Sequence, residues 1–275
     1  MVVAADSRGA GLVQLLQNAL PRWVIEAFAA ATYLGDSVVL LALAALVYYG
    51  YDRAEGAFVL GTLFAGFALV ITTKAWFELP RPPRTLQFVA ETGYGFPSGH
   101  AVGVTVGWGA LGIALEELST GRRRVSVAAI VIGTVALSRV VIGVHYFVDV
   151  VVGIGVGLVV LGVSARWLRR SPLAVFGAAG GLAAVAVAVA GGSTRSVALF
   201  GACVGALLTW QLIEPADRPF GREGVLATAG GGVLIGALTA FQAPVTAFMF
   251  GAGGALTAGV LVLPVARSGW LDGAN

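Results

Sequence analysis

The sequence predicts an all-α protein, a polytopic bundle of transmembrane helices. Of its 275 residues, 58% are hydrophobic and only 11% are charged, and a water-soluble domain of this length cannot bury so much apolar surface. The stretches 38–49, 125–137 and 150–163 contain no charged residue. In hydrocarbon each stretch must be helical, because a helix satisfies its own backbone hydrogen bonds.

Nine apolar spans follow one another along the chain, or eight if the last two form one short hairpin. They are residues 24–50, 55–77, 98–117, 124–142, 146–167, 172–190, 195–212, 224–241 and 243–266. The first span contains a break near Gly35 and Asp36, so residues 22–35 could lie in the membrane interface. Residues 11–20 have leucines at helical spacing with polar residues opposite, which predicts a short amphipathic helix on the membrane surface, stopped by Pro21. No cleaved signal peptide is expected.

The distribution of arginine predicts the orientation in the membrane. Short loops on one side contain most of the arginines, namely Arg53, Arg122, Arg123, Arg124, Arg166, Arg169, Arg170, Arg218, Arg222 and Arg267. By the positive-inside rule this side is cytoplasmic. The remaining cations lie on the other side, and most of them are concentrated in two segments, so they need a local explanation.

Three segments at that second, extracytoplasmic side contain the polar residues of interest. The first is 74–84, which ends the second span; the second is 96–100, which opens the third span; the third is 138–149, between the fourth and fifth spans. The only lysine of the chain and both of its histidines lie in these segments. Charged residues near membrane spans are costly and indicate a functional site.

Several of these residues suit a phosphate group. Lys74, Arg81 and Arg139 supply cations, and arginine can bind phosphate oxygens in a bidentate manner. Ser98 and Gly99 precede a helix, where free backbone N–H groups and the positive end of the helix dipole favour an anion. The Ser98 hydroxyl is also a candidate to cap that helix.

The two histidines are candidates for the chemistry. His145 and Asp149 are four residues apart and share one face if the segment is helical. The carboxylate would then hold one imidazole nitrogen and leave the other free to attack. His100 is the natural general acid for the leaving oxygen. No metal or other cofactor is expected, because the surrounding cations would repel a divalent ion.

The order and spacing of these residues resemble a known family, the type 2 phosphatidic acid phosphatase (PAP2) superfamily. The matching motifs are Lys74-x6-Arg81-Pro82, Pro97-Ser98-Gly99-His100 and Ser138-Arg139-x5-His145-x3-Asp149. The resemblance implies that His145 is the nucleophile, Asp149 its orienting partner and His100 the acid that later activates water. It also implies phosphoryl-oxygen contacts from a further set of residues: Lys74, Arg81, Ser98, Gly99, Arg139 and Ser138.

The resemblance covers residues 36–167 and implies a core of about six helices. We therefore expect an N-terminal interfacial segment (1–35), a PAP2-like catalytic core (36–171) and additional transmembrane helices (172–275), the first of which could complete the core. The family implies a lipid phosphate or diphosphate as substrate, within the membrane bilayer. The charge pattern gives no reason to expect nucleic acid as a partner, and the oligomeric state is left open.

Other functions stay open at this point. The same site could pass the phosphoryl group to an acceptor other than water, as a phosphotransferase. The extra C-terminal helices could move a lipid across the membrane. Soluble relatives with these motifs hold vanadate and act as haloperoxidases, although membrane embedding favours a lipid substrate instead. Glu91 is interpreted as a solvated loop residue that could tune substrate entry.

Overall fold

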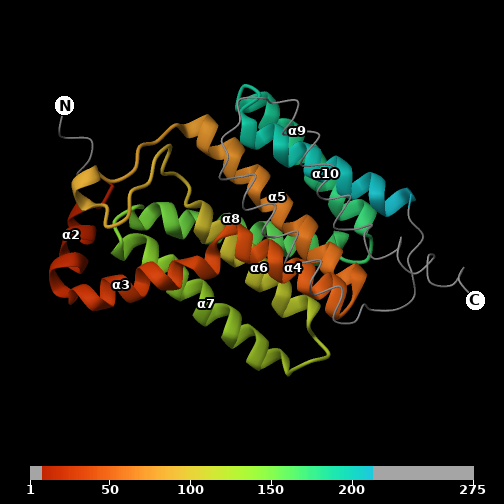
Figure 1. The fold of residues 1–275 in the computed structure, drawn as a ribbon, viewed down its shortest axis with the longest axis horizontal. Helices are drawn as coiled ribbons and strands as arrows, with labels where there is room; N and C mark the ends of the chain where they lie inside the picture. The colour runs from red at the N-terminus through yellow and green to blue at the C-terminus, as the bar shows by residue number, and fades with distance from the viewer. Residues whose placement is uncertain (1–7, 213–275) are drawn as a thin grey trace, which may run out of the picture.

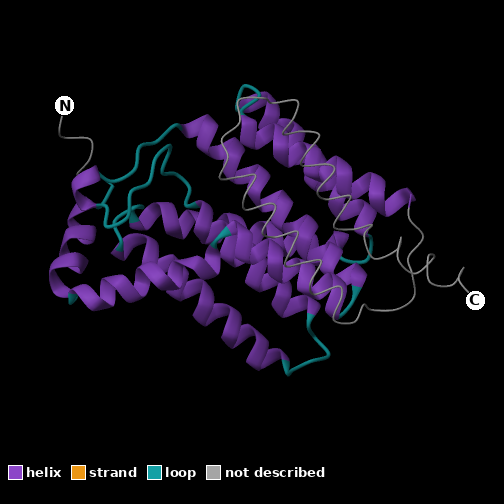
Figure 2. Ribbon diagram, in the orientation of Figure 1, coloured by secondary structure: helices purple, strands orange, loops and turns teal. Residues whose placement is uncertain are grey.

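The computed structural model describes residues 8–212, and this part of the chain is entirely helical (Figures 1 and 2). It contains nine α-helices joined by loops and short turns. They are α2 (Ala10–Ala19), α3 (Arg22–Ala31), α4 (Ser37–Gly50), α5 (Arg53–Phe77), α6 (Gly99–Ala114), α7 (Gly121–Val141), α8 (Phe147–Val163), α9 (Pro172–Val189) and α10 (Thr194–Leu212). The all-α fold is confirmed. The spans expected at 224–241 and 243–266 lie outside the described residues.

Within residues 8–212, four helices are long and apolar enough to cross a membrane: α5, α7, α8 with its continuation to Leu168, and α9. A fifth span is formed if α3, the 3₁₀ turn η1 (Thr32–Gly35) and α4 count as one broken helix, bent by 46°. Asp36 lies at the break and caps α4 by accepting a hydrogen bond from Val38 N at 2.9 Å. The break near Gly35 and Asp36 is confirmed, and the chain is a multi-pass membrane protein.

Helix α5 lies at the centre of the bundle and packs against α4, α6, α9 and α10. Its residues Phe58 and Leu63 are completely buried, and Phe176 of α9 packs in the same core. Helix α9 therefore belongs to the same packed body as α5. The division of the chain at residues 171 and 172 stays a prediction.

Small residues bring α6 and α8 into close contact. A Cβ atom added at Gly153 of α8 would lie 2.9 Å from both the Ala101 side chain and the Ser98 carbonyl oxygen. One added at Gly157 would lie 2.7 Å from Thr105 of α6. Because glycine has no side chain, the two backbones approach closely. This contact sets the relative position of the first turns of α6 and α8.

Helix α2 forms where the amphipathic segment was predicted, and it also contacts the rest of the protein; its position on the membrane surface stays a prediction. Its Val13 is fully buried against Ala136 and Val140 of α7. Its Gln17, expected on the solvent side, donates hydrogen bonds to Leu86 O at 2.9 Å and Val141 O at 3.0 Å. One side of α2 is thus covered by protein, which the helical spacing of its leucines could not reveal.

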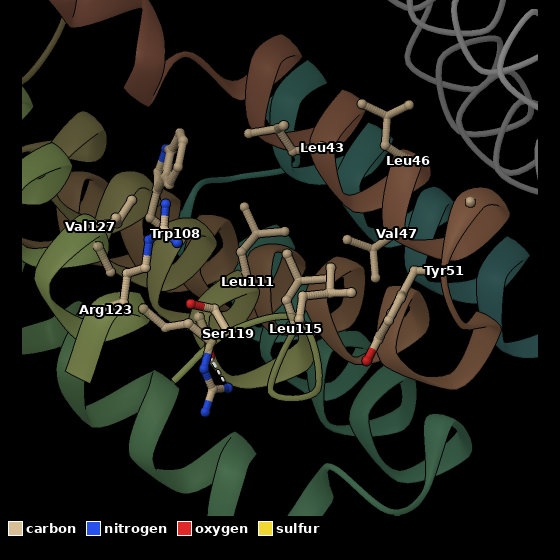
Figure 3. A pocket seen from close by; sticks show the side chains of 15 residues that line it. Leu43, Leu46, Val47, Tyr51, Trp108, Leu111, Leu115, Ser119, Arg123 and Val127 are labelled. Atoms are coloured by element: carbon tan, nitrogen blue, oxygen red, sulfur yellow. Dashed lines mark hydrogen bonds between the residues drawn. The ribbon is translucent and has the colours of Figure 1, made fainter. Parts of the chain in front are cut away.

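A groove of about 720 Å³ lies between α4, α6 and α7 (Figure 3). Apolar side chains such as Leu43, Leu111 and Val127 line it, and Arg123 lies at one edge. The groove is near the α6–α7 connection, and none of the nine predicted site residues contributes to it. The predicted site residues therefore lie away from this groove.

Candidate active site

The predicted site residues lie at one end of the bundle, where the loop 78–98 meets the α7–α8 turn (Figure 1). Phe88 N donates to Ile142 O at 2.9 Å and joins the two segments. Gly143 has a φ of +73°, and a Cβ there would lie 1.9 Å from Leu86 O. Only glycine fits both the left-handed backbone and this close approach. The α7–α8 turn therefore packs closely against the loop 78–98.

His145 and Asp149 form a buried pair where α8 begins. Asp149 Oδ2 accepts a hydrogen bond from Tyr146 N at 3.0 Å and lies 3.5 Å from His145 Nδ1. The two side chains are 1% and 0% exposed. The other imidazole nitrogen, Nε2, lies 3.0 Å from Arg81 Nη1. Since a guanidinium only donates, Nε2 is the acceptor and Nδ1 carries the proton. Nδ1 has Asp149 as its nearest charged neighbour but forms no hydrogen bond in the described part of the chain.

The His145 imidazole is held in its neutral form. Burial is the largest cause that moves the pKa of His145 well below its ordinary value, and the charges of Arg81, Lys74 and Arg139 lower it further. Glu91 acts in the opposite direction. A neutral imidazole has a free electron pair at neutral pH, which a nucleophile requires.

Three cations surround this pair. Arg139 is 2% exposed, donates from Nη1 to Thr32 Oγ1 at 2.8 Å, and has a buried Nε without a hydrogen-bond partner in the described part of the chain. Arg81 donates to Val144 O at 3.1 Å. Lys74 donates from Nζ to Tyr94 O at 2.7 Å. A buried, unpaired guanidinium N–H is costly, and a phosphoryl oxygen would satisfy it.

Glu91 is a site residue that the sequence analysis misjudged as solvated. Its Oε2 lies 2.9 Å from Arg81 Nη2, and its Oε1 pairs with Arg139 Nη2. Burial alone would raise the pKa of Glu91, but the charges of Arg139 and Arg81 lower it to about 2. The carboxylate is therefore ionised. Its pairing was not predictable because Arg139 is 48 residues away along the chain.

The remaining predicted residues lie around the first turn of α6 and the end of α7. Ser98 caps α6 by accepting from Ala101 N at 3.4 Å, and its own backbone N donates to Asp149 O at 2.9 Å. Gly99 opens the helix, where the first N–H groups have no intrahelical partner. The half-buried His100 is within reach of the charges of Arg139 and Glu91.

Ser138 is fully buried, and its hydroxyl donates to Val135 O at 2.6 Å within α7. No contact joins it to the other predicted site residues in the described structure. The structure therefore brings Lys74, Arg81, Arg139, His145 and Asp149 together with Glu91, and places Ser98, Gly99 and His100 beside them. The part that Ser138 plays in phosphate binding stays a prediction.

The fold and this cluster define a multi-pass membrane protein with histidines and buried cations gathered at one end of its helices. The model of the PAP2 superfamily matches residues 55–172, which contain all nine predicted site residues. The chain is 31% identical over 145 residues to phosphatidylglycerophosphatase B of Bacillus subtilis (strain 168), covering 50% of this chain and 71% of that protein. The chain belongs to the PAP2 superfamily and is a phosphatase.

A solved structure of the superfamily agrees with the fold. The crystal structure of a transmembrane PAP2-type phosphatidylglycerolphosphate phosphatase from Bacillus subtilis superposes with a TM-score of 0.54 at 22% identity, covering 61% of this chain and 88% of that one. LpxE of Aquifex aeolicus superposes with a TM-score of 0.49 at 22% identity, covering 58% of this chain and 95% of that one.

Proposed function

We propose that this phosphatase hydrolyses a lipid phosphate or diphosphate through a phosphohistidine intermediate on the extracytoplasmic side of the membrane. The observation that carries the proposal is the position of His145. Its Nδ1 faces Asp149, its Nε2 faces Arg81, and both neighbours lie within the residues that match the superfamily. Nucleophile, orienting carboxylate and anion-binding cation are therefore in contact around one imidazole.

In the first step, His145 Nε2 attacks the phosphorus atom and the bond from phosphorus to the leaving oxygen breaks. His100, which takes up a proton when the phosphoryl anion binds beside it, donates that proton to the oxygen as it leaves. The phosphorylated imidazole carries a positive charge, which the buried Asp149 carboxylate stabilises through Nδ1–H. Arg81, Arg139 and Lys74 neutralise the charge on the phosphoryl oxygens, as in other phosphoryl transfers.

In the second step, water attacks the phosphorus atom and the bond from phosphorus to Nε2 breaks. The now neutral His100 takes the proton from the water, so it returns to its starting state. Inorganic phosphate leaves and His145 is neutral again. His100 alone moves the proton: it donates once to the leaving oxygen and accepts once from the attacking water, while His145 keeps its Nδ1 proton throughout.

The substrate is proposed from the membrane setting and from the relative. The site lies at the ends of membrane-spanning helices, where the headgroup of a lipid is found. The name of the Bacillus relative points to phosphatidylglycerol phosphate, which is therefore the first compound to test. The extracytoplasmic side is supported by the arginines in the short loops at the opposite end of the helices.

A panel assay tests the proposal. Purified protein in mixed micelles is given phosphatidylglycerol phosphate, phosphatidate and a polyprenyl diphosphate, and phosphate release is measured. At least one lipid should be hydrolysed, with activity lost by at least about a thousandfold in His145→Ala, since removing a nucleophile leaves only residual catalysis. Full activity in a correctly folded His145→Ala protein would contradict the proposal.

A further inference from the structure

The N-terminal segment 8–20, which lies outside the part of the chain that matches the PAP2 superfamily, reaches the catalytic pair. Arg8 Nη1 lies 3.6 Å from Asp149 Oδ1, the carboxylate oxygen that does not face His145. The guanidinium also lies over the Tyr146 ring, 4.6 Å from its centroid, and donates to Pro80 O. Arg8 therefore touches the start of α8 and the loop 78–98 at the same time.

The rest of the segment holds Arg8 in place. Val13 of α2 is completely buried against Ala136 and Val140. Gln17 donates one hydrogen bond to the loop 78–98, at Leu86 O, and one to the end of α7, at Val141 O. These contacts tie α2 to both chain segments that form the site, so that Arg8 enters from a fixed position and not from a free terminus.

The charges around Asp149 show why such a contact matters. The side chain is 0% exposed, and Oδ1 has no hydrogen-bond partner in the described part of the chain. A buried carboxylate with one unsatisfied oxygen is costly. Arg8 supplies the countercharge for that oxygen, while Tyr146 N and His145 Nδ1 approach the other.

We propose that segment 8–20 is part of the catalytic unit and that Arg8 is a positioning residue, which holds the Asp149 carboxylate from the side opposite His145. The inference rests on the proposed function of His145 as nucleophile. By pairing with the Asp149 carboxylate, Arg8 weakens the electrostatic stabilisation that this carboxylate gives to protonated His145. It thereby helps to keep the imidazole neutral together with Arg81, Lys74 and Arg139, whereas Glu91, which also faces the imidazole, acts in the opposite direction.

The sign of the effect follows from the charges. If Arg8 is replaced by a neutral residue, the Asp149 carboxylate no longer interacts with a second cation and stabilises protonated His145 better. One positive charge near His145 is also removed. Both changes raise the pKa of His145. Opposite charges within about 4–6 Å typically shift a pKa by about 1–3 units. Because Arg8 acts through Asp149, we expect a rise of about one unit, with the acidic limb of kcat/KM moving up by a similar amount.

The test compares Arg8→Gln with Arg8→Lys, which keeps the charge, and with Arg22→Gln, a control near the N-terminus whose side chain is 83% exposed and pairs with Glu26. The chain has only two histidines, so NMR of ¹⁵N-histidine protein in micelles can titrate His145 without any turnover. A His100→Gln sample assigns the signals. Activity-based pH profiles give the second readout.

The expected result is a higher pKa of His145 in Arg8→Gln, a return toward the original value in Arg8→Lys, and no change in Arg22→Gln. Unchanged titration in Arg8→Gln would overturn the inference, as would an activity loss that is equal at all pH values. These outcomes differ from a failure of the proposed function, which would show as activity without His145. Melting temperature in micelles verifies that each variant is folded.

Discussion

At the scale of single residues, Glu91 changes the picture of the cation cluster. Its carboxylate pairs with Arg81 and Arg139, two of the three cations proposed to bind the phosphoryl group. A carboxylate and a phosphoryl group both present oxygen atoms to a guanidinium. Glu91 therefore occupies the place that substrate oxygens need, and the substrate must displace it or share the arginines with it.

Replacing Glu91 by glutamine should tighten the binding of oxyanions. Without the competing charge, Arg81 and Arg139 are free to pair with the ligand, and the inhibition constants of inorganic phosphate and vanadate should fall by about tenfold, the effect of roughly one charge-assisted contact. Inhibition assays measure this. Glu78→Gln is the matched control, because Glu78 accepts from the Tyr94 hydroxyl and not from an arginine. Unchanged or weaker inhibition would show that Glu91 does not compete.

Sequence reasoning found the residues whose types are rare and whose spacing is regular. Lys74, His100 and His145 are conspicuous by count, and Asp149 by its spacing from His145. Glu91 and Arg8 could not be found in this way. Each pairs with residues far away along the chain, and a single acidic or basic residue in a loop or near a terminus does not indicate its partner. Only the packing of α2 and the loop 78–98 reveals both.

At the scale of helices, the contact between α6 and α8 aligns the two halves of the site. Ser98 caps α6, Asp149 lies in the first turn of α8, and a hydrogen bond joins their backbones at 2.9 Å. His100 follows Ser98 by two residues, and His145 precedes Asp149 by four. The glycines of α8 allow this approach, so the distance between acid and nucleophile depends on them.

Gly153→Ala should therefore impair catalysis. The new methyl group would lie 2.9 Å from Ser98 O, a backbone atom that cannot move without α6. We expect at least a tenfold loss of kcat, since small displacements of catalytic groups are costly, and a destabilisation of about 1–3 kcal/mol from overpacking. Gly155→Ala, on the same helix with open space around its Cβ, is the control and should be neutral. Equal effects of the two substitutions would refute this account of α8.

The positions of the helices were predictable because the apolar stretch and the capping residue before it indicate the same start for each helix. Asp52, Ser98 and Thr120 each cap the helix that follows, and the observed starts of α5, α6 and α7 lie within three residues of the predicted spans. The environment of α2 was less accessible. The leucine spacing does not reveal that Val13 is the α2 side chain buried against α7, while Leu12 and Leu15 stay exposed.

At the scale of the whole molecule, the two ends of the helices differ in how their charges are used. At the end opposite the site, Arg169 pairs with Glu55 at 2.8 Å and with Glu116 at 3.0 Å in partly exposed positions. At the site end, three cations that are buried or partly buried lie around two carboxylates, Asp149 and Glu91, and a neutral imidazole. The first arrangement fits a loop region that anchors the protein, and the second fits a site for an incoming anion.

The central claim is that His145 becomes phosphorylated during turnover. In the most direct test, the enzyme is mixed with a lipid that it hydrolyses, labelled with ³²P in the scissile phosphate, and the reaction is quenched rapidly. Peptides are then mapped under alkaline conditions, which preserve phosphohistidine. We predict label on the peptide that contains His145 and none in His145→Ala. In His100→Ala the label should accumulate, because loss of the residue that activates water slows the second step. Turnover without label on His145, or label on another residue, would contradict the account.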